Sequence, residues 1–244
     1  MPIRSALVRY APNESWAAHE HDVMSISVVL GGHLTETVGR SEVQAALGSV
    51  VVKPVKSVHS NHFGPSGAVF LAIWPGDLIA GEVAPKAADR WQWRHDPAGL
   101  KRWIAIAGEL ALDDRWGVAE EEVIELLHAD SDGAGHEPPA RLRRVRDQLH
   151  ALGPERPSVA LLAQSLGLHP GYLTRTFRRH YGCSISAYVR RLRVRRAAAI
   201  LIGDAPPPIA ALAQELGFAD QSHFCRTFRS ELGLTPAAYR RALS

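Results

Sequence analysis

The segment Val159-Ala-Leu-Leu-Ala-Gln-Ser-Leu-Gly-Leu168 recurs fifty residues later as Ile209-Ala-Ala-Leu-Ala-Gln-Glu-Leu-Gly-Phe218. A second pair of similar segments follows at an offset of fifty-one, Leu173-Thr-Arg-Thr-Phe-Arg178 and Phe224-Cys-Arg-Thr-Phe-Arg229. Each copy predicts a short helix that ends in Leu-Gly, a tight turn, and a second amphipathic helix. The glycine in each turn can take the positive φ that a sharp helix–helix connection needs. The chain is therefore predicted to contain two helix-turn-helix units.

The second helix of each copy has an apolar face and a polar face. Leu173 and Phe177 are four residues apart, as are Phe224 and Phe228, so each pair is expected to face the core. The opposite faces carry Thr174, Arg175, Arg178 and Arg179 in the first copy, and Gln221, Ser222, Cys225, Arg226 and Arg229 in the second. Recognition of base edges in the major groove requires such outward polar and arginine side chains. The alternative is a plain helical bundle whose arginines are solvated.

A single helix is predicted to join the two copies, over residues 184–202, with Ser184 or Ser186 as its cap. About nineteen residues span roughly 28 Å, which is comparable with the roughly 34 Å of one DNA turn. The segment Gly203-Asp-Ala-Pro-Pro-Pro208 is expected to end this helix. Some of its five arginines are expected to contact phosphate and others to pair with acids, because they cannot all face one way: Arg190, Arg191, Arg193, Arg195 and Arg196.

Charge is divided unevenly along the 244 residues, although the formal net charge is only +3. Residues 140–244 hold 17 arginines, no lysine and 6 acids, for a net +11, whereas residues 1–139 carry a net −8. A basic part joined to an acidic part indicates a polyanion-binding module beside a separate domain. Residues 129–139 have the Gly, Pro, Ser and Asp composition of a linker. We therefore expect a domain over 1–130, a linker over 131–139 and a second domain over 140–244.

The acidic part is predicted to be mainly β-structure. Residues 25–30, 49–52 and 68–74 are β-branched or apolar runs, with breaks expected at Gly31-Gly32, Gly48, Gly64-Pro65 and Pro75-Gly76. Such short runs between glycines are typical of a small antiparallel sandwich or barrel. Apolar residues at helical spacing then predict helices over 98–112 and 118–128. The expected fold class is α+β and multidomain, with an N-terminal β-barrel and helices followed by an all-α double helix-turn-helix.

Specific motifs in residues 140–244 resemble the DNA-binding domain of the AraC/XylS family of bacterial transcription regulators. The second copy contains Ile209-Ala-x-x-Ala213, Leu216-Gly-Phe218, Asp220-Gln-Ser222, Phe224, Arg226-x-Phe228 and Gly233-x-Thr-Pro-x-x-Tyr-Arg240. The first copy matches in Leu162-Ala163, Leu166-Gly167, Leu173, Arg175-x-Phe177 and Gly182. The resemblance implies that two units on one linker helix enter neighbouring major grooves. It further implies base contacts by Thr174, Arg175, Gln221, Ser222, Cys225 and Arg226, and a packing role for Pro236 and Tyr239.

Histidines in the acidic part form a second pattern. His19-Glu-His21 places two imidazoles on one face of a strand. Further along stands Gly48-x5-Pro54-x4-His59, followed by Asn61-His62. The two segments resemble the two cupin motifs, and this resemblance implies that His19, His21 and His59 hold a divalent metal, with His62 as a substitute ligand. Ser25 or Ile26 stands where the motif has a carboxylate, and Lys56 where it has a glycine.

Imidazoles with an open coordination position suit Zn, Fe, Ni or Cu. A metal-free pocket for a small molecule and a purely structural barrel are the other two interpretations of the histidines. Trp74, Trp91 and Trp93 are candidates to line such a pocket. Leu110, Val123 and Leu127 have to bury against the barrel or against a second copy of the chain, and the family resemblance implies a dimer interface there.

These patterns predict a sequence-specific DNA-binding transcription regulator, and not an enzyme. A small-molecule effector in the barrel would shift the arrangement of domains or subunits and so change DNA binding. The expected partners are double-stranded DNA, the effector, a second copy of the chain and RNA polymerase. No membrane partner is expected because no apolar run approaches the ~18 residues of a membrane span. The alternative is a metal-dependent cupin enzyme with a helical nucleic-acid-binding accessory domain.

The expected location is the cytoplasm, in association with the nucleoid. The N-terminal segment has no long apolar stretch of the secretory kind, and Cys183 and Cys225 cannot build a disulfide framework or a cysteine-rich zinc site.

Overall fold

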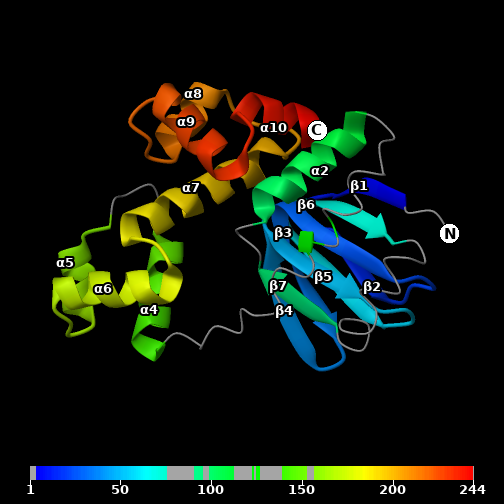
Figure 1. The fold of residues 1–244 in the computed structure, drawn as a ribbon, viewed down its shortest axis with the longest axis horizontal. Coiled ribbons are helices and arrows are strands. Elements are labelled where there is room, and N and C mark those ends of the chain that lie inside the picture. Colours follow the sequence, from blue (N-terminus) through cyan, green and yellow to red (C-terminus); the bar gives the residue numbers. More distant parts are fainter. Residues whose placement is uncertain are drawn as a thin grey trace. The chain divides into compact units, whose positions relative to one another are not determined.

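A computed structural model (Figure 1) describes residues 4–75, 91–95, 99–112, 123, 125–126, 139–152 and 157–243. By contact, the chain divides into two compact units. The first comprises Met1–Gly133, Ala198–Pro206 and Leu232–Ser244, and the second Ala134–Ala197 and Pro207–Glu231. The described helices include none with the length and apolar character that a bilayer span needs. The domain boundaries expected from composition remain a prediction.

Strands of the first unit form one antiparallel sheet of seven strands. They are β1 (Arg4–Tyr10), β2 (Ser15–His19), β3 (Ser25–Val38), β4 (Ser41–Ala46), β5 (Ser49–Lys53), β6 (His59–Trp74) and β7 (Gln92–His95). Their order is β1-β6-β3-β5-β7, with β2 also paired to β6 and β4 to β3. The expected antiparallel β-structure is confirmed, and the α+β class with it. The long strands β3 and β6 lie in the middle of this order, where β6 pairs with β1 and β3 pairs with β5.

Two of the strand breaks expected from glycine are wrong. β3 continues through Gly31-Gly32, and β6 continues through Gly64-Pro65. The β3–β6 pairing instead shifts register between Val29 and Gly31 and again between Gly32 and Leu34. Gly32 has a φ of 71°, and a Cβ there would collide with the backbone of Gly67. These glycines therefore make bulges within a strand rather than its end. The break at Gly48, with a φ of 86°, is confirmed.

Helix α2 (Leu100–Leu112) confirms the first helix predicted after the sheet. Its Trp103, Ile104, Ile106 and Ala107 are buried. Of the second predicted helix, only residues 123, 125 and 126 lie in the described part of the chain; they are helical, with Val123 and Leu126 buried. The side chains of Leu110 and Leu127 lie outside the described residues. The same unit includes the end of the chain, where Tyr239 of α10 (Pro236–Leu243) donates a hydrogen bond to the carbonyl oxygen of Leu30. Tyr239 and Pro236 are buried, so their predicted packing role is confirmed.

The second unit is helical. It contains α4 (Ala140–Ala151), α5 (Val159–Ser165), α6 (Pro170–Tyr181), most of α7 (Ile185–Leu201), α8 (Ile209–Glu215) and nearly all of α9 (Gln221–Leu232). Leu142 and Val145 of α4 pack with Leu173 and Phe177 of α6 in one apolar cluster that also includes residues of α5 and α7. In Figure 1, α7 runs from the group α4–α6 to the pair α8 and α9. The single linker helix is confirmed, and its cap is Ser184, whose Oγ accepts a hydrogen bond from the Ala187 N–H at 3.2 Å.

Candidate nucleic-acid interface and histidine cluster

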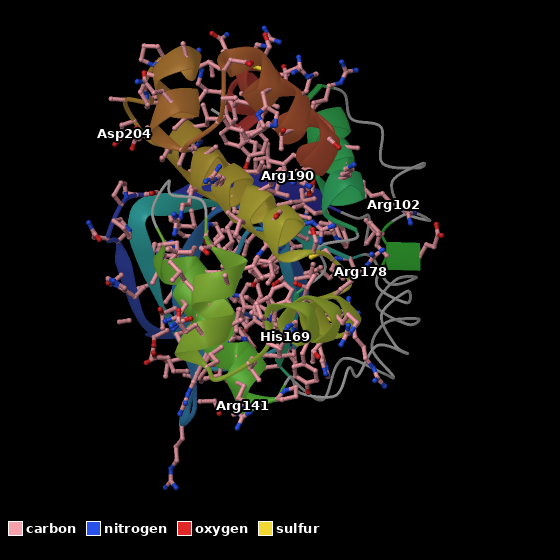
Figure 2. All side chains as sticks on the ribbon, turned by 90° about the vertical axis from the view of Figure 1, so that its left-hand side faces the viewer. Arg102, Arg141, His169, Arg178, Arg190 and Asp204 are labelled. Carbon is pink, nitrogen blue, oxygen red and sulfur yellow. The ribbon has the colours of Figure 1, made fainter. Side chains whose placement is uncertain are left out.

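Helices α5 and α6 form the first helix-turn-helix. Gly167 lies in the turn with a φ of 64°, as its position after the Leu-Gly signal predicts. His169 then caps α6, because its Nδ1 accepts a hydrogen bond from the Gly171 N–H at 3.2 Å. Leu173 and Phe177 are fully buried. This burial leaves the opposite face in solvent, where four predicted DNA contacts are exposed: Thr174, Arg175, Arg178 and Arg179. Figure 2 labels His169 at the start of this helix and Arg178 in its last turn.

The Thr174 hydroxyl donates a hydrogen bond to the Pro170 carbonyl at 3.0 Å within its own helix. That bond holds the hydroxyl proton on the backbone, so only the methyl group and the oxygen lone pairs remain for a base.

Helices α8 and α9 repeat the arrangement. Gly217 has a φ of 72° in the turn, and Asp220 Oδ1 caps α9 by accepting a hydrogen bond from the His223 N–H at 2.6 Å. Phe224 and Phe228 are fully buried. Among the predicted contacts, Cys225 is half-buried and the others are exposed: Gln221, Ser222, Arg226 and Arg229. Both second helices therefore have the polar outer face that the sequence predicts.

The arginines of α7 have unequal roles. Arg191 Nε lies 3.3 Å from a carboxylate oxygen of Glu231, which agrees with the expected pairing to an acid. Arg196 instead donates hydrogen bonds to the carbonyl oxygens of His150 and Leu152, each at 2.5 Å. Burial lowers the pKa of Arg195. Arg190 is exposed and stays available to a phosphate (Figure 2).

Arg193 is buried and donates from Nη1 to the carbonyl oxygen of Gly217 at 2.8 Å. The sequence does not predict the backbone contacts of Arg193 and Arg196, since both residues sit in a run that looks uniformly basic.

The structure brings together three of the four predicted ligand histidines. We call His19, His21 and His59 the histidine cluster. One ring nitrogen from each lies within 4.8 Å of the others. His19 on β2 is paired with His59 on β6, and His21 follows in the next loop. His62 is exposed and its Nδ1 is bonded to Ser15 Oγ at 2.8 Å. Because β6 runs straight through both positions, His59 and His62 face opposite sides of the strand, and His62 stays outside the cluster.

Backbone carbonyls orient two rings of the cluster. His19 Nδ1 lies 2.9 Å from the carbonyl oxygen of Ala17, and His59 Nδ1 lies 3.1 Å from that of Ser57. A carbonyl oxygen only accepts, so in a neutral ring each Nδ1 carries the proton and each Nε2 keeps a lone pair. Burial, with help from the Lys53 charge, lowers the pKa of His59 to about 4. Burial also lowers the pKa of His21, and the neighbouring His19 adds to this effect.

Beneath the cluster lies a carboxylate that sequence analysis missed. Glu36 is fully buried on β3 and accepts hydrogen bonds from Lys53 Nζ and Asn61 Nδ2, both at 2.8 Å. The indole N–H groups of Trp91 and Trp93 add two more, at 2.7 and 2.5 Å. The only sequence signal was the Trp-x-Trp alternation, which places both indoles on one face of a strand. Both carboxylate oxygens of Glu36 therefore already accept two hydrogen bonds each.

Lys56 explains a departure from the cupin motif. It has a φ of 59°, the conformation that favours the glycine expected there. Its ammonium pairs with Glu20 Oε1 at 3.1 Å and with Asp22. These acids, the nearest to the histidines in sequence, thus point to Lys56. They lie in the loop after β2, which ends at His19, so the expectation that His19 and His21 share one strand face is wrong.

The cluster opens on a small cavity of about 60 Å³. The three histidines, Lys53 and Asn61 line this space together with aromatic side chains that include Tyr10 and Trp16. Trp91 packs on His59, with ring centroids 4.5 Å apart. Among the described residues that line this cavity, none is one of the three tryptophans predicted to do so; Trp74 ends β6 and is half-buried.

Residues 162–242 match the family model described as a helix-turn-helix domain. This match confirms the predicted helix-turn-helix region, and the segment is similar to AraC-type helix-turn-helix domains. Regulatory protein PocR of Salmonella typhimurium is 34% identical over 83 residues, which cover 34% of this chain and 27% of PocR. The HTH-type transcriptional regulator YpdC of Escherichia coli is 37% identical over 78 residues, which cover 32% of this chain and 27% of YpdC. These matches thus span about a quarter of each relative.

A longer match covers nearly all of this chain. The HTH-type transcriptional activator RhaR of Yersinia pestis is 25% identical over 275 positions, 98% of this chain and 89% of RhaR. Among solved structures, an AraC-type regulator from Chromobacterium violaceum covers 43% of this chain and 92% of its own, with 26% identity and a TM-score of 0.40. ToxT of Vibrio cholerae bound to an unsaturated fatty acid covers 99% and 96%, with 10% identity and a TM-score of 0.42.

Proposed function

We propose that this AraC-type protein is a sequence-specific DNA-binding regulator of transcription. The observation that carries the proposal is the shared geometry of α6 and α9. Each helix buries an apolar pair completely and exposes the polar face of the same Arg-Thr-Phe-Arg motif. An exposed helix of this kind after a tight turn is the element that enters a major groove in helix-turn-helix proteins.

Arg175 and Arg226 hold equivalent places in the two copies, and both are exposed. Arginine forms two parallel hydrogen bonds with the O6 and N7 atoms of guanine, so these two residues are the proposed base contacts. Exposed Thr174, Gln221 and Ser222, with half-buried Cys225, complete the proposed contact surface. Arg178, Arg179, Arg190 and Arg229 are exposed near it and are proposed to bind phosphates.

The N-terminal domain is proposed to sense a small ligand in the cavity at the histidine cluster. A ligand that binds one arrangement of the chain better than another shifts the population toward it and so changes DNA occupancy. We propose that the regulator acts in the cytoplasm as a homodimer and contacts RNA polymerase. The nearby acids Glu20 and Asp22 are held by Lys56, which supports a role in sensing rather than in enzymatic acid–base chemistry.

Selection of DNA from a random library by the purified full chain tests the proposal. The retained DNA should share a sequence with two contacted segments about 10–10.5 base pairs apart, because two helices on one linker helix enter successive grooves. Retained DNA without a common sequence would contradict sequence-specific recognition.

A further inference from the structure

We propose that His19, His21 and His59 together bind one divalent transition-metal cation that prefers imidazole ligands, of which Zn²⁺ is the test case. This inference rests on the proposed function, since it names the class of effector that the N-terminal domain takes. The inference is based on the hydrogen bonds and spacing of the three imidazole rings, and on the ligand atoms available around them.

The strongest observation is an orphaned ring nitrogen. His59 is only 2% exposed, and its Nε2 has no hydrogen-bond partner among the described residues. Leaving a buried polar atom without a partner is unfavourable, because the atom gives up its hydrogen bonds to water and gains none in return. A cation on this nitrogen would remove that cost. The other nitrogen of the ring is already bonded to the Ser57 carbonyl.

The orientation of the rings matches that of metal-bound histidines. Such a histidine usually donates its other ring N–H to a carbonyl or carboxylate, which directs the lone pair of the ligating nitrogen at the metal. His19 and His59 both have this arrangement, with the carbonyl groups of Ala17 and Ser57 as acceptors. The Lys56 N–H donates to the His21 carbonyl at 2.8 Å, so the backbone of the third histidine is anchored as well.

The spacing fits a metal after a small adjustment. Ligating nitrogens lie within 4.8 Å of one another. Two nitrogens on one tetrahedral zinc are roughly 3.3 Å apart, given Zn–N bonds of about 2.0–2.1 Å. The rings therefore have to approach by at most about 1.5 Å for a zinc-like geometry, a movement within the reach of side-chain rotation. Their centroids already lie 4.2–5.2 Å apart.

The donor set selects the kind of cation. Three imidazoles suit Zn, Cu, Fe and Ni, whereas Mg and Ca require oxygen ligands. Glu36 is the nearby buried carboxylate, and it is occupied by Lys53, Asn61, Trp91 and Trp93. Neutral imidazoles leave the full charge on the cation, and three protein ligands leave a position open toward the cavity.

Metal analysis of tag-free full-length protein tests the site. After equilibration with Zn²⁺ and dialysis, elemental analysis should find one zinc per chain. Co²⁺ should give visible absorption bands typical of nitrogen coordination. His59→Ala and His19→Ala should each weaken Zn²⁺ binding by on the order of a hundredfold or more, since even supporting residues contribute 10–100-fold.

His62→Ala is the matched control, because His62 lies on the same strand outside the cluster. It should bind Zn²⁺ like the parent protein. Circular dichroism establishes whether each variant is folded. If His59→Ala is not folded, His59→Gln is used in its place. Less than a tenth of an equivalent of zinc in folded parent protein, or equal loss in the His62 variant, would overturn the inference.

DNA binding is measured separately on the same samples with and without Zn²⁺. A chain that selects a common DNA sequence but takes up no metal refutes the metal site and leaves the proposed function standing. A chain that binds zinc through the three histidines but selects no DNA sequence supports the metal site and refutes the proposed function. A Zn²⁺-dependent change in DNA affinity that His19→Ala abolishes identifies the cation as the effector. If DNA affinity is the same with and without Zn²⁺, the cation is not the effector.

Discussion

Arg193 in the middle of α7 donates a hydrogen bond to the carbonyl oxygen of Gly217, at a distance of 2.8 Å. Gly217 forms the turn of the second helix-turn-helix, with a φ of 72°. The arginine is only 7% exposed, so the bond is largely shielded from water. The linker helix thus holds the turn that sets the direction of α9, by a contact with its backbone.

Arg193→Ala is expected to destabilise the protein by about 1–3 kcal/mol, because it leaves the Gly217 carbonyl without its charged donor. Urea unfolding followed by circular dichroism measures the change. Arg190→Ala is the control: this arginine lies one turn earlier on α7 and is exposed, so its effect should stay within about 0.5 kcal/mol. Equal stabilities of the two variants would show that the buried contact contributes nothing.

Arg175→Ala and Arg226→Ala should each weaken binding to the selected DNA sequence by about 1–3 kcal/mol and relax the preference for one base pair. Each variant loses the two hydrogen bonds that the arginine is proposed to make with a guanine edge, while the buried side of its helix is unchanged. Binding assays against the selected sequence and single-base variants measure the effect. Arg40→Ala, an exposed arginine in the turn between β3 and β4, should leave both properties intact. Uniform weakening on all sequences would assign Arg175 and Arg226 to phosphates.

Glu36→Gln is expected to destabilise the N-terminal domain by about 3–5 kcal/mol, since it leaves a buried lysine without its counter-charge. Lys53 is buried, and burial lowers its pKa against the opposing effect of Glu36. The variant should therefore also unfold more readily as pH falls, when Lys53 is forced to keep its proton. Thermal unfolding at two pH values measures this, with exposed Glu42→Gln on β4 as the comparison. A variant as stable as the parent would mean that Lys53 is neutral or finds water.

His150 is expected to make stability depend on pH. Burial lowers the pKa of His150 below its usual 6.5, and Arg146 adds to the effect. The unfolded state therefore binds the proton first as pH falls below 6.5, and stability should decrease from there down to the folded-state pKa. Urea unfolding between pH 7.5 and 5 measures this slope. His150→Gln should make this slope shallower without removing it, because burial also lowers the pKa values of His21 and His59. The exposed His180→Gln should leave the slope unchanged; identical slopes in all three proteins would refute the assignment.

Local patterns predicted most of the helical region. The repeat, the Leu-Gly turns and the four-residue spacing of Leu173 and Phe177 specify helices through contacts between near neighbours in sequence, and these depend little on the rest of the chain. The same logic failed at Gly31-Gly32 and Gly64-Pro65, where pairing of long strands absorbs glycine as a bulge. It also failed for Arg193 and Arg196, because a basic run does not reveal which side chains the next helix will cover.

The sequence by itself determined two helix-turn-helix units with polar outer faces on one linker helix, since helical periodicity and glycine turns act over a few residues. Only the tertiary structure decided that His59, and not His62, joins His19 and His21, and that Glu36 is enclosed by Lys53, Asn61, Trp91 and Trp93. Those contacts join segments up to 57 residues apart. They follow from strand register, where a shift by one residue exchanges the buried and exposed faces.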